Sequence, residues 1–137
     1  MLKRILIPLM AAAMLLFAFG CSTVPPLSDN FDEATVKKAA ENVIVFFNAQ
    51  DSEAIRGMSN ETLTAVLTDE TLQEIYTAIS ENGAFVEFGD AVTFGSSDKA
   101  TGTEYAVVVV KASYETKALT YTISFDTNMK LAGIYYK

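Results

Sequence analysis

Between residues 31 and 50, apolar side chains recur at i, i+4, i+7 and i+11, which is the spacing of an amphipathic helix. The members of this stripe are Val36, Ala39, Ala40, Val43, Phe46 and Phe47. Asp29, Asn30 or Asp32 is suited to cap the start of such a helix. The pattern therefore predicts a helix over residues 31–50 with one face in the core.

Two further helices are predicted before the pattern changes. Ser52 is suited to cap a short helix over residues 53–58, and Thr68 a longer helix that ends at Gly83. The longer helix has one apolar stripe, formed by Leu72, Ile75, Tyr76 and Ile79. Residues 60–67, which lie between the two helices, have no clear periodicity, so their structure stays open.

After Gly83 the apolar period changes to two, which indicates β-strands over residues 86–94, 104–115, 118–126 and 131–136. Val86, Phe88, Val92 and Phe94 share one parity in the first strand, with Gly89 and Asp90 between them as a predicted bulge. The inward residues of the next two strands are Ala106, Val108, Val110, Ala112, Tyr114, Leu119, Tyr121, Ile123 and Phe125. Short polar turns between the strands predict an antiparallel meander. The chain is therefore expected to have an α+β fold, with N-terminal helices packed on one four-stranded sheet.

The first 20 residues have the features of a secretory leader and precede Cys21, the only cysteine of the chain. Lys3 and Arg4 are followed by an uncharged run of 15 residues, 5–19, and then by Gly20. A transmembrane helix needs ~20 apolar residues. The shorter run therefore indicates the apolar part of a signal peptide.

Residues 18–21, Ala-Phe-Gly-Cys, resemble the lipobox of bacterial lipoproteins. The resemblance implies that the Cys21 thiol receives a diacylglycerol and that the leader is cut before it. An ordinary signal peptide followed by an unpaired thiol is the alternative. The expected organisation is a signal peptide at residues 1–20, a lipidated cysteine with a tether at 21–30, and one α+β domain at 31–137. Pro25 and Pro26 favour an extended tether of about 30 Å.

Lipidation would place the protein in the cell envelope, on the outer face of the cytoplasmic membrane or in the outer membrane. Ser22 follows the cysteine, whereas aspartate at that position favours inner-membrane retention in lipoproteins. If the host has two membranes, the outer one is therefore favoured.

Composition excludes several classes of function. The chain has a formal net charge of −7, and removal of the leader leaves 8 basic against 17 acidic side chains. Such a surface is repelled by nucleic-acid phosphates and anionic lipid headgroups, so nucleic acid is not expected as a partner. The chain has no histidine, which excludes Ser-His-Asp and Cys-His machinery and imidazole-based zinc sites. Accordingly, no metal or cofactor is expected.

The sequence resembles a bacterial family of domains of unknown function, number 3887. The resemblance rests on residues 46–51 (FFNAQD), Gly83 and residues 130–134 (KLAGI), and it covers residues 35–135. Members are often exported or lipid-anchored. The resemblance implies a fold similar to the nuclear-transport-factor-two-like and cystatin-like group, in which a cone-like sheet wraps the helices. That group contains isomerases, dehydratases and non-catalytic binding or dimerising domains, so it selects no activity.

Asp90 is a candidate general base, because it has the parity of Phe88 and Val92 and a buried carboxylate has a raised pKa. The alternative is that the bulge at Gly89 turns Asp90 to water. Tyr114 and Tyr121 are the accompanying candidate hydrogen-bond donors, with packing in the sheet as their alternative role.

Tyr105, Val107 and Val109 form an apolar patch if the other face of their strand is open. Such a patch would bind a partner or a second copy of the domain.

The leading interpretation is a lipid-anchored envelope protein that binds a small apolar or amphipathic ligand or docks onto another envelope protein. The alternatives are an isomerase or hydratase that uses Asp90 with Tyr114 or Tyr121, and a structural subunit of a surface complex. A roomy pocket holding both a carboxylate and a tyrosine hydroxyl would favour the enzyme. A packed interior with an exposed apolar sheet face would favour the interaction module.

Overall fold

The computed structural model describes residues 24–137, so the leader and Cys21 lie outside the described residues. The helices are α1 (Glu33–Asn48), α2 (Ser52–Met58), α3 (Glu61–Val66) and α4 (Asp69–Ser80). They precede the strands β1 (Phe85–Ser97), β2 (Glu104–Tyr114), β3 (Ala118–Phe125) and β4 (Leu131–Tyr136). The sheet order is β1-β2-β3-β4 with antiparallel neighbours, which confirms the α+β meander predicted from the sequence.

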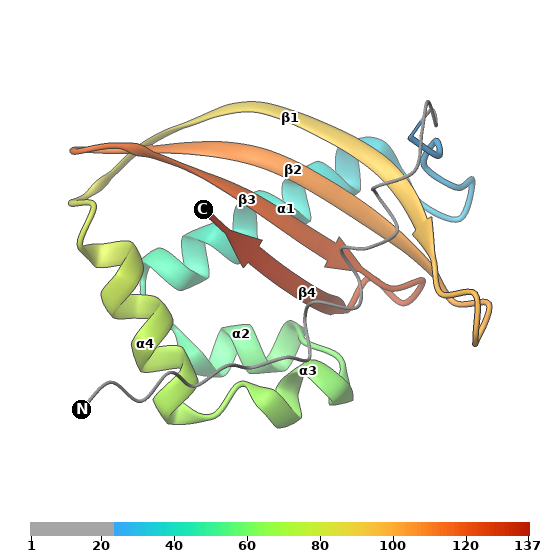
Figure 1. The fold of residues 1–137 in the computed structure, drawn as a ribbon, viewed down its shortest axis with the longest axis horizontal. Coiled ribbons are helices and arrows are strands. Elements are labelled where there is room, and N and C mark those ends of the chain that lie inside the picture. Colours follow the sequence, from blue (N-terminus) through green and yellow to red (C-terminus); the bar gives the residue numbers. More distant parts are fainter. Residues whose placement is uncertain (1–23) are drawn as a thin grey trace, which may run out of the picture.

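The sheet arches over the helices, which all lie on its concave side (Figure 1). Its inner face follows the predicted parity in β2 and β3, because alternate residues of both strands are buried. The helices contribute the apolar stripes of α1 and α4 to the same core. Side chains that are at most 1% exposed include Val36, Val43, Ile44, Phe47, Ile55, Leu72, Val108, Val110, Tyr121, Ile123, Phe125 and Leu131.

Side-chain caps set the helix starts. The Asp32 carboxylate accepts from the Thr35 backbone N–H at the start of α1, and Thr68 caps α4 as predicted. At α2 the prediction is one residue late, because Asp51 is the cap and Ser52 is the first helical residue. Asn60 caps α3, so the segment left open by the sequence is a helix.

β1 differs from its predicted pattern because two bulges interrupt its pairing with β2. The shift between Phe88 and Ala91 contains Gly89 and Asp90 and confirms the predicted bulge, whereas the shift just after Phe85 has no counterpart in the prediction. Each shift changes the face that the next side chains take. Phe85, Phe88 and Ala91 therefore pack against the core, whereas Val86 and Val92 are 60% and 59% exposed. The prediction that these two valines face inward is wrong.

Residues 25–31, called the strap below, contact the domain rather than forming a free tether. The Gly95 backbone N–H donates to the Pro25 carbonyl oxygen at 2.9 Å, which places the strap along the edge strand β1. Gly95 has no side chain to hold the strap away, and an added Cβ would lie 2.5 Å from the Pro26 carbonyl oxygen. The strap therefore covers part of an otherwise unpaired sheet edge.

Side chains secure the rest of the strap. Phe31 is 8% exposed and belongs to the core, and Leu27 packs against it. The Ser28 hydroxyl and the Asn30 amide both donate to Glu104 Oε2 of β2, at 3.1 and 2.6 Å. The structural unit consequently begins near Pro25, before the predicted boundary at residue 31.

Candidate functional site

Two tyrosine hydroxyls meet inside the molecule beside the end of α1. Tyr114 ends β2 and Tyr121 lies in β3, and both belong to the core face of the sheet. Their hydroxyl oxygens are 2.6 Å apart, and the Tyr114 hydroxyl donates to Asn48 Oδ1 at 2.7 Å. Each hydroxyl carries one proton, so Tyr121 donates to Tyr114, which donates to Asn48.

Both hydroxyls are held in the neutral form. Burial raises the pKa of Tyr121, and the hydrogen bond with Tyr114 raises this pKa further. Burial also raises the pKa of Tyr114, against the opposing effect of its hydrogen bonds with Tyr121 and Asn48. The pair can donate and accept hydrogen bonds near neutral pH, but it supplies no charged base.

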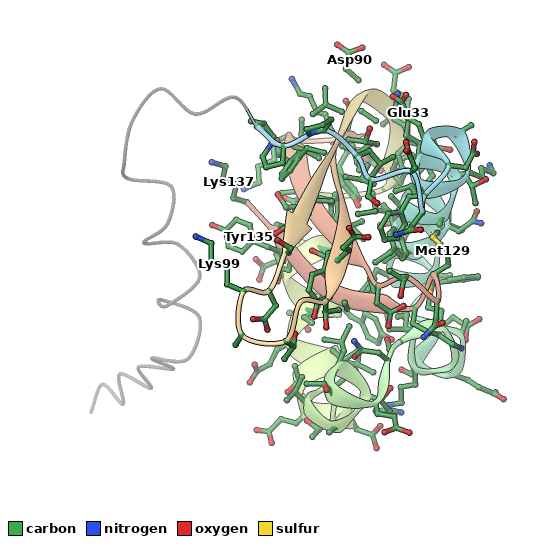
Figure 2. The ribbon with its side chains drawn as sticks, turned by 90° about the vertical axis from the view of Figure 1, so that its right-hand side faces the viewer. Glu33, Asp90, Lys99, Met129, Tyr135 and Lys137 are labelled. Atoms are coloured by element: carbon green, nitrogen blue, oxygen red, sulfur yellow. The ribbon has the colours of Figure 1, made fainter. Side chains whose placement is uncertain are left out.

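Asp90 does not join these tyrosines. It is exposed in β1, next to the second bulge, and Figure 2 shows it projecting from the top of the molecule. Of the two readings of Asp90, the structure supports the one in which the bulge at Gly89 turns its side chain to water, because the register shift after Phe88 breaks the parity that would place it inward. The structure therefore brings together Tyr114 and Tyr121 without the candidate base.

A small hollow opens beside Tyr114, between the end of α1 and α4. Its volume is 240 Å³, below the ~300–1,000 Å³ of typical ligand pockets. No charged side chain is among the residues that line it within the described chain. The lining residues are Phe47, Asn48, Gln50, Tyr76, Ile79, Ser80, Gly83, Ala84, Phe85 and Tyr114. Such walls suit a small, uncharged and partly aromatic molecule.

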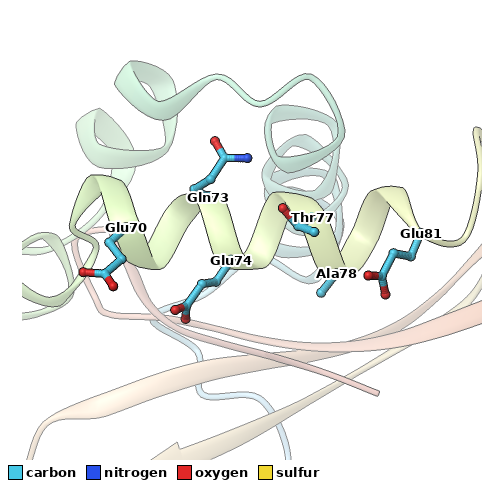
Figure 3. A pocket seen from close by; sticks show the side chains of 6 residues that line it. All are labelled: Glu70, Gln73, Glu74, Thr77, Ala78 and Glu81. Carbon is cyan, nitrogen blue, oxygen red and sulfur yellow. The ribbon is translucent and has the colours of Figure 1, made fainter.

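A larger, open hollow of 460 Å³ follows the exposed side of α4 (Figure 3). The carboxylates of Glu70, Glu74 and Glu81 extend to one side of the helix, while Gln73 points the other way. Within residues 24–137, no group of three or more carboxylate, histidine or cysteine side chains is arranged to hold a metal ion. The α4 surface is therefore an acidic helix face.

The sheet face opposite the helices, called the outer face below, carries a cross-strand row over all four strands. Val92, Val109, Thr122 and Tyr135 are successive partners in the ladder. Val92 is 59% exposed and Tyr135 is 40% exposed. Apolar and aromatic side chains thus lie open along this row, while the start of α3 reaches the outer face only at a hollow beside Tyr105 and Val107.

The patch expected from Tyr105, Val107 and Val109 lies on this outer face, but its exposed members differ. Val107 is only 7% exposed, and Tyr105 and Val109 are half-buried. Phe94 pairs with Val107 and so also lies on the outer face, although its parity predicts an inward position. The patch is therefore centred on the row that joins Val92 to Tyr135, and not on Val107.

Charge is divided unevenly between the two layers. Residues 29–81, which contain the helices, carry eleven acidic and three basic side chains, a net charge of −8. Residues 85–137, which contain the sheet, carry six acidic and five basic side chains, a net charge of −1. All ion pairs among the described residues use cations of the helical part; they are Lys37–Glu33, Lys38–Glu41 and Arg56–Asp69. Nearly all of the excess negative charge therefore belongs to the helical layer.

Lys111 and Lys137 border the outer-face row. Lys111 is the ladder partner of Thr120, which exchanges two backbone hydrogen bonds with Lys137. Neither lysine forms an ion pair within residues 24–137. In Figure 2 the side chains of Lys99, Tyr135 and Lys137 project from the same side of the molecule, away from the helices.

No helix of the described part is long and apolar enough to span a bilayer.

Comparison with known proteins gives a family and a related structure. Residues 40–134 match the model of a family described as "Protein of unknown function (DUF3887)". The NMR structure of a protein from Ruminococcus gnavus ATCC 29149 is similar, with 25% sequence identity and a TM-score of 0.72. The match covers 82% of this chain and 96% of that one. No curated protein matches the chain.

Proposed function

Because this chain belongs to the DUF3887 family, whose description assigns no activity, its role has to be argued from its surfaces, and we propose a lipid-anchored interaction module of the cell envelope. The observation that carries the proposal is the exposed outer-face row, in which Val92 and Tyr135 stand open to solvent. Together with the half-buried Val109 beside Val92, these side chains form an apolar row of the kind found at contact surfaces. The outer face is thus the proposed contact surface.

The anchor is proposed from the leader. A basic start, a 15-residue apolar run and Ala-Phe-Gly-Cys support diacylglycerol attachment at Cys21. Two or more acyl chains make membrane attachment stable, because each buried methylene contributes ~0.8 kcal/mol.

We expect Cys21→Ala to move the protein from the membrane fraction to the soluble fraction, because it removes the thiol that carries the lipid. Cell fractionation and immunoblotting measure the distribution, with Ser22→Ala as the control that should stay in the membrane. Wild-type protein that incorporates no radiolabelled palmitate would contradict the anchor.

The enzyme alternative has little support. It needs a carboxylate beside a tyrosine hydroxyl, yet Asp90 is exposed and the hollow beside Tyr114 has no charged lining residue within residues 24–137. The two paired hydroxyls are neutral. The packed interior of the domain agrees better with an interaction module that acts through its surface than with an enzyme.

The proposed contact surface is tested with two valines of equal exposure on opposite layers. Val92 of the outer face is 59% exposed and Val66 of α3 is 58% exposed. Each is replaced in turn by cysteine and treated with a maleimide reagent in isolated envelopes. Since the lipid occupies Cys21, the introduced thiol is the only reactive one. We expect Val92→Cys to react more slowly than Val66→Cys in envelopes, and equally fast after detergent extraction. Equal rates in intact envelopes would remove the outer face as a contact surface.

The hollow beside Tyr114 supports a second candidate function, which is the binding of a small uncharged ligand. The carrying observation is that Asn48 and Gln50 offer amide groups beside aromatic walls. Native mass spectrometry of the purified protein would detect a retained ligand. Ala84→Trp fills the hollow and should abolish the additional mass of the ligand. If the wild-type protein has only the mass of the lipidated chain, this candidate function has no support.

A further inference from the structure

We propose that the outer face lies against the anionic bilayer that holds the lipid anchor, with the acidic helical layer turned away from the membrane. This inference rests on the proposed lipid attachment at Cys21 and names what covers the contact surface. It is carried by the length of the free chain, the division of charge and the chemistry of the outer face.

The strap leaves very little free chain between the anchor and the domain. Pro25 is already bonded to Gly95, so only residues 22–24 separate it from Cys21. Four extended Cα–Cα steps reach about 13 Å. The domain is therefore held at the membrane surface, whereas a tether running to residue 30 would allow it to stand clear.

The strap also determines which side is nearest to the anchor. Its blue start lies on the side of the molecule from which Lys99, Tyr135 and Lys137 project (Figure 2). The helices occupy the opposite, concave side of the sheet (Figure 1). A short connection at this point brings the outer face toward the bilayer and leaves the helices outside.

Charge favours the same orientation. Bacterial-type anionic lipids give the membrane a negative surface potential, which repels the helical part with its net charge of −8. The sheet part has a net charge of only −1, and the outer face presents Lys111 and Lys137 without ion-pair partners among the described residues. For this face alone, the proposal departs from the expectation that anionic headgroups repel the acidic chain.

The side chains of the outer-face row suit the interface between headgroups and acyl chains. Tyr135 combines an aromatic ring with a hydroxyl, and tyrosines concentrate at membrane–water interfaces. Val92 adds exposed apolar area, while lysines at the border extend their ammonium groups to phosphates. The anchor already confines the domain to the surface, so even a weak contact is populated through the high effective concentration.

The test uses full-length lipidated protein in vesicles of phosphatidylethanolamine and phosphatidylglycerol. Val92→Cys and the matched Val66→Cys are each labelled with a fluorophore. Iodide then quenches from water and a headgroup nitroxide quenches from the lipid. We expect the Val92 probe to be quenched by the nitroxide and shielded from iodide, and the Val66 probe to show the reverse.

Charge reversal gives a second measurement that leaves the core unchanged. Each lysine near an anionic surface contributes about fivefold to binding. The double variant Lys111→Glu with Lys137→Glu should therefore make the Val92 probe accessible to iodide quenching again. Circular dichroism verifies that the double variant is folded.

Two results would overturn the inference, and a third concerns the anchor. Equal quenching of the two probes would mean that the bilayer does not select the outer face. A Val92 probe shielded from iodide without nitroxide quenching would assign the face to a second copy of the chain. Labelling of the wild-type protein at Cys21 would instead remove the proposed lipid, and with it the membrane attachment.

Discussion

Replacing Gly95 with alanine is expected to lower the free energy of unfolding by about 1–3 kcal/mol and to displace the strap from β1. The new Cβ would lie 2.5 Å from the Pro26 carbonyl oxygen and 3.7 Å from Leu27 Cα. Both are backbone atoms, so no side-chain rotation relieves the clash. The strap has to move, and the hydrogen bond between Gly95 and Pro25 is lost with it. Urea denaturation measures the change in stability.

Gly57→Ala is the matched control for this experiment. Gly57 lies in α2, and an added Cβ there has no neighbour within 4 Å among the described residues. Alanine is favoured over glycine inside a helix by about 1 kcal/mol, so this variant should gain stability. Opposite signs for the two substitutions would show that the contact at Gly95 matters, whereas a neutral Gly95→Ala would mean that the strap is not tightly held.

The same substitution connects the strap to the membrane. Ser28 and Asn30 still hold their part of the strap to Glu104, so displacement of Pro25 and Pro26 lengthens the free chain from residues 22–24 to about residue 27, which raises its reach from about 13 Å to about 23 Å. In Gly95→Ala the iodide shielding of a Val92 probe should then weaken. This links a single glycine in an edge strand to the orientation of the whole domain.

The sequence predicts the regular parts of this fold because their patterns are local. The α1 stripe follows the helical period, and β2 and β3 keep one parity without a bulge between them, so their core-face residues are identified correctly. The cap of α2 is displaced by one residue because Asp51 and Ser52 have nearly equal capping preference. Short-range information thus gives the elements, with an error of about one residue at this boundary.

Long-range pairing accounts for the features that the sequence does not reveal. The bulge after Phe85 depends on how β1 matches β2 and has no local signal. Gly89 and Asp90 do signal the second bulge, but the pattern does not show that this bulge turns Val92 to the outer face. The strap depends on a contact between Pro25 and Gly95, which are 70 residues apart in the sequence. The prolines alone indicate a free tether. At the candidate site the strand parity of the two tyrosines correctly places both on the core face, but it does not predict the hydrogen bond between them. Asn48 has no such signal, since it is one of several polar residues near a helix end.

The buried tyrosine pair predicts a loss of stability at alkaline pH. An unfolded tyrosine has a pKa of about 10, and burial raises the pKa of Tyr114 and Tyr121 above that value. Above about pH 10 the unfolded chain therefore releases protons that the folded chain retains. Stability is fully present below this pH and falls as the pH rises, by about 1.4 kcal/mol per pH unit for each such tyrosine.

Tyr121→Phe isolates this effect. At pH 7 the variant should be less stable by about 1 kcal/mol, because the Tyr114 oxygen loses the hydrogen bond donated by Tyr121. Above about pH 10 the variant lacks one retained proton, so its stability falls less steeply and the difference from wild type closes or reverses. Urea denaturation at a series of pH values measures both slopes.

Tyr135→Phe is the control, because Tyr135 lies on the outer face and its side chain is 40% exposed. This variant keeps the buried pair intact, so the alkaline loss of stability that the pair causes should persist in it. If Tyr121→Phe instead runs parallel to wild type through the alkaline range, the two hydroxyls ionise in the folded protein. The interior would then be wet enough to hold a phenolate, and the argument against a catalytic site beside Tyr114 would have to be withdrawn. If stability falls less steeply with pH in Tyr121→Phe than in Tyr135→Phe, the pair is neutral and dry inside the domain. Binding to partners then has to occur on the outer surfaces of the domain.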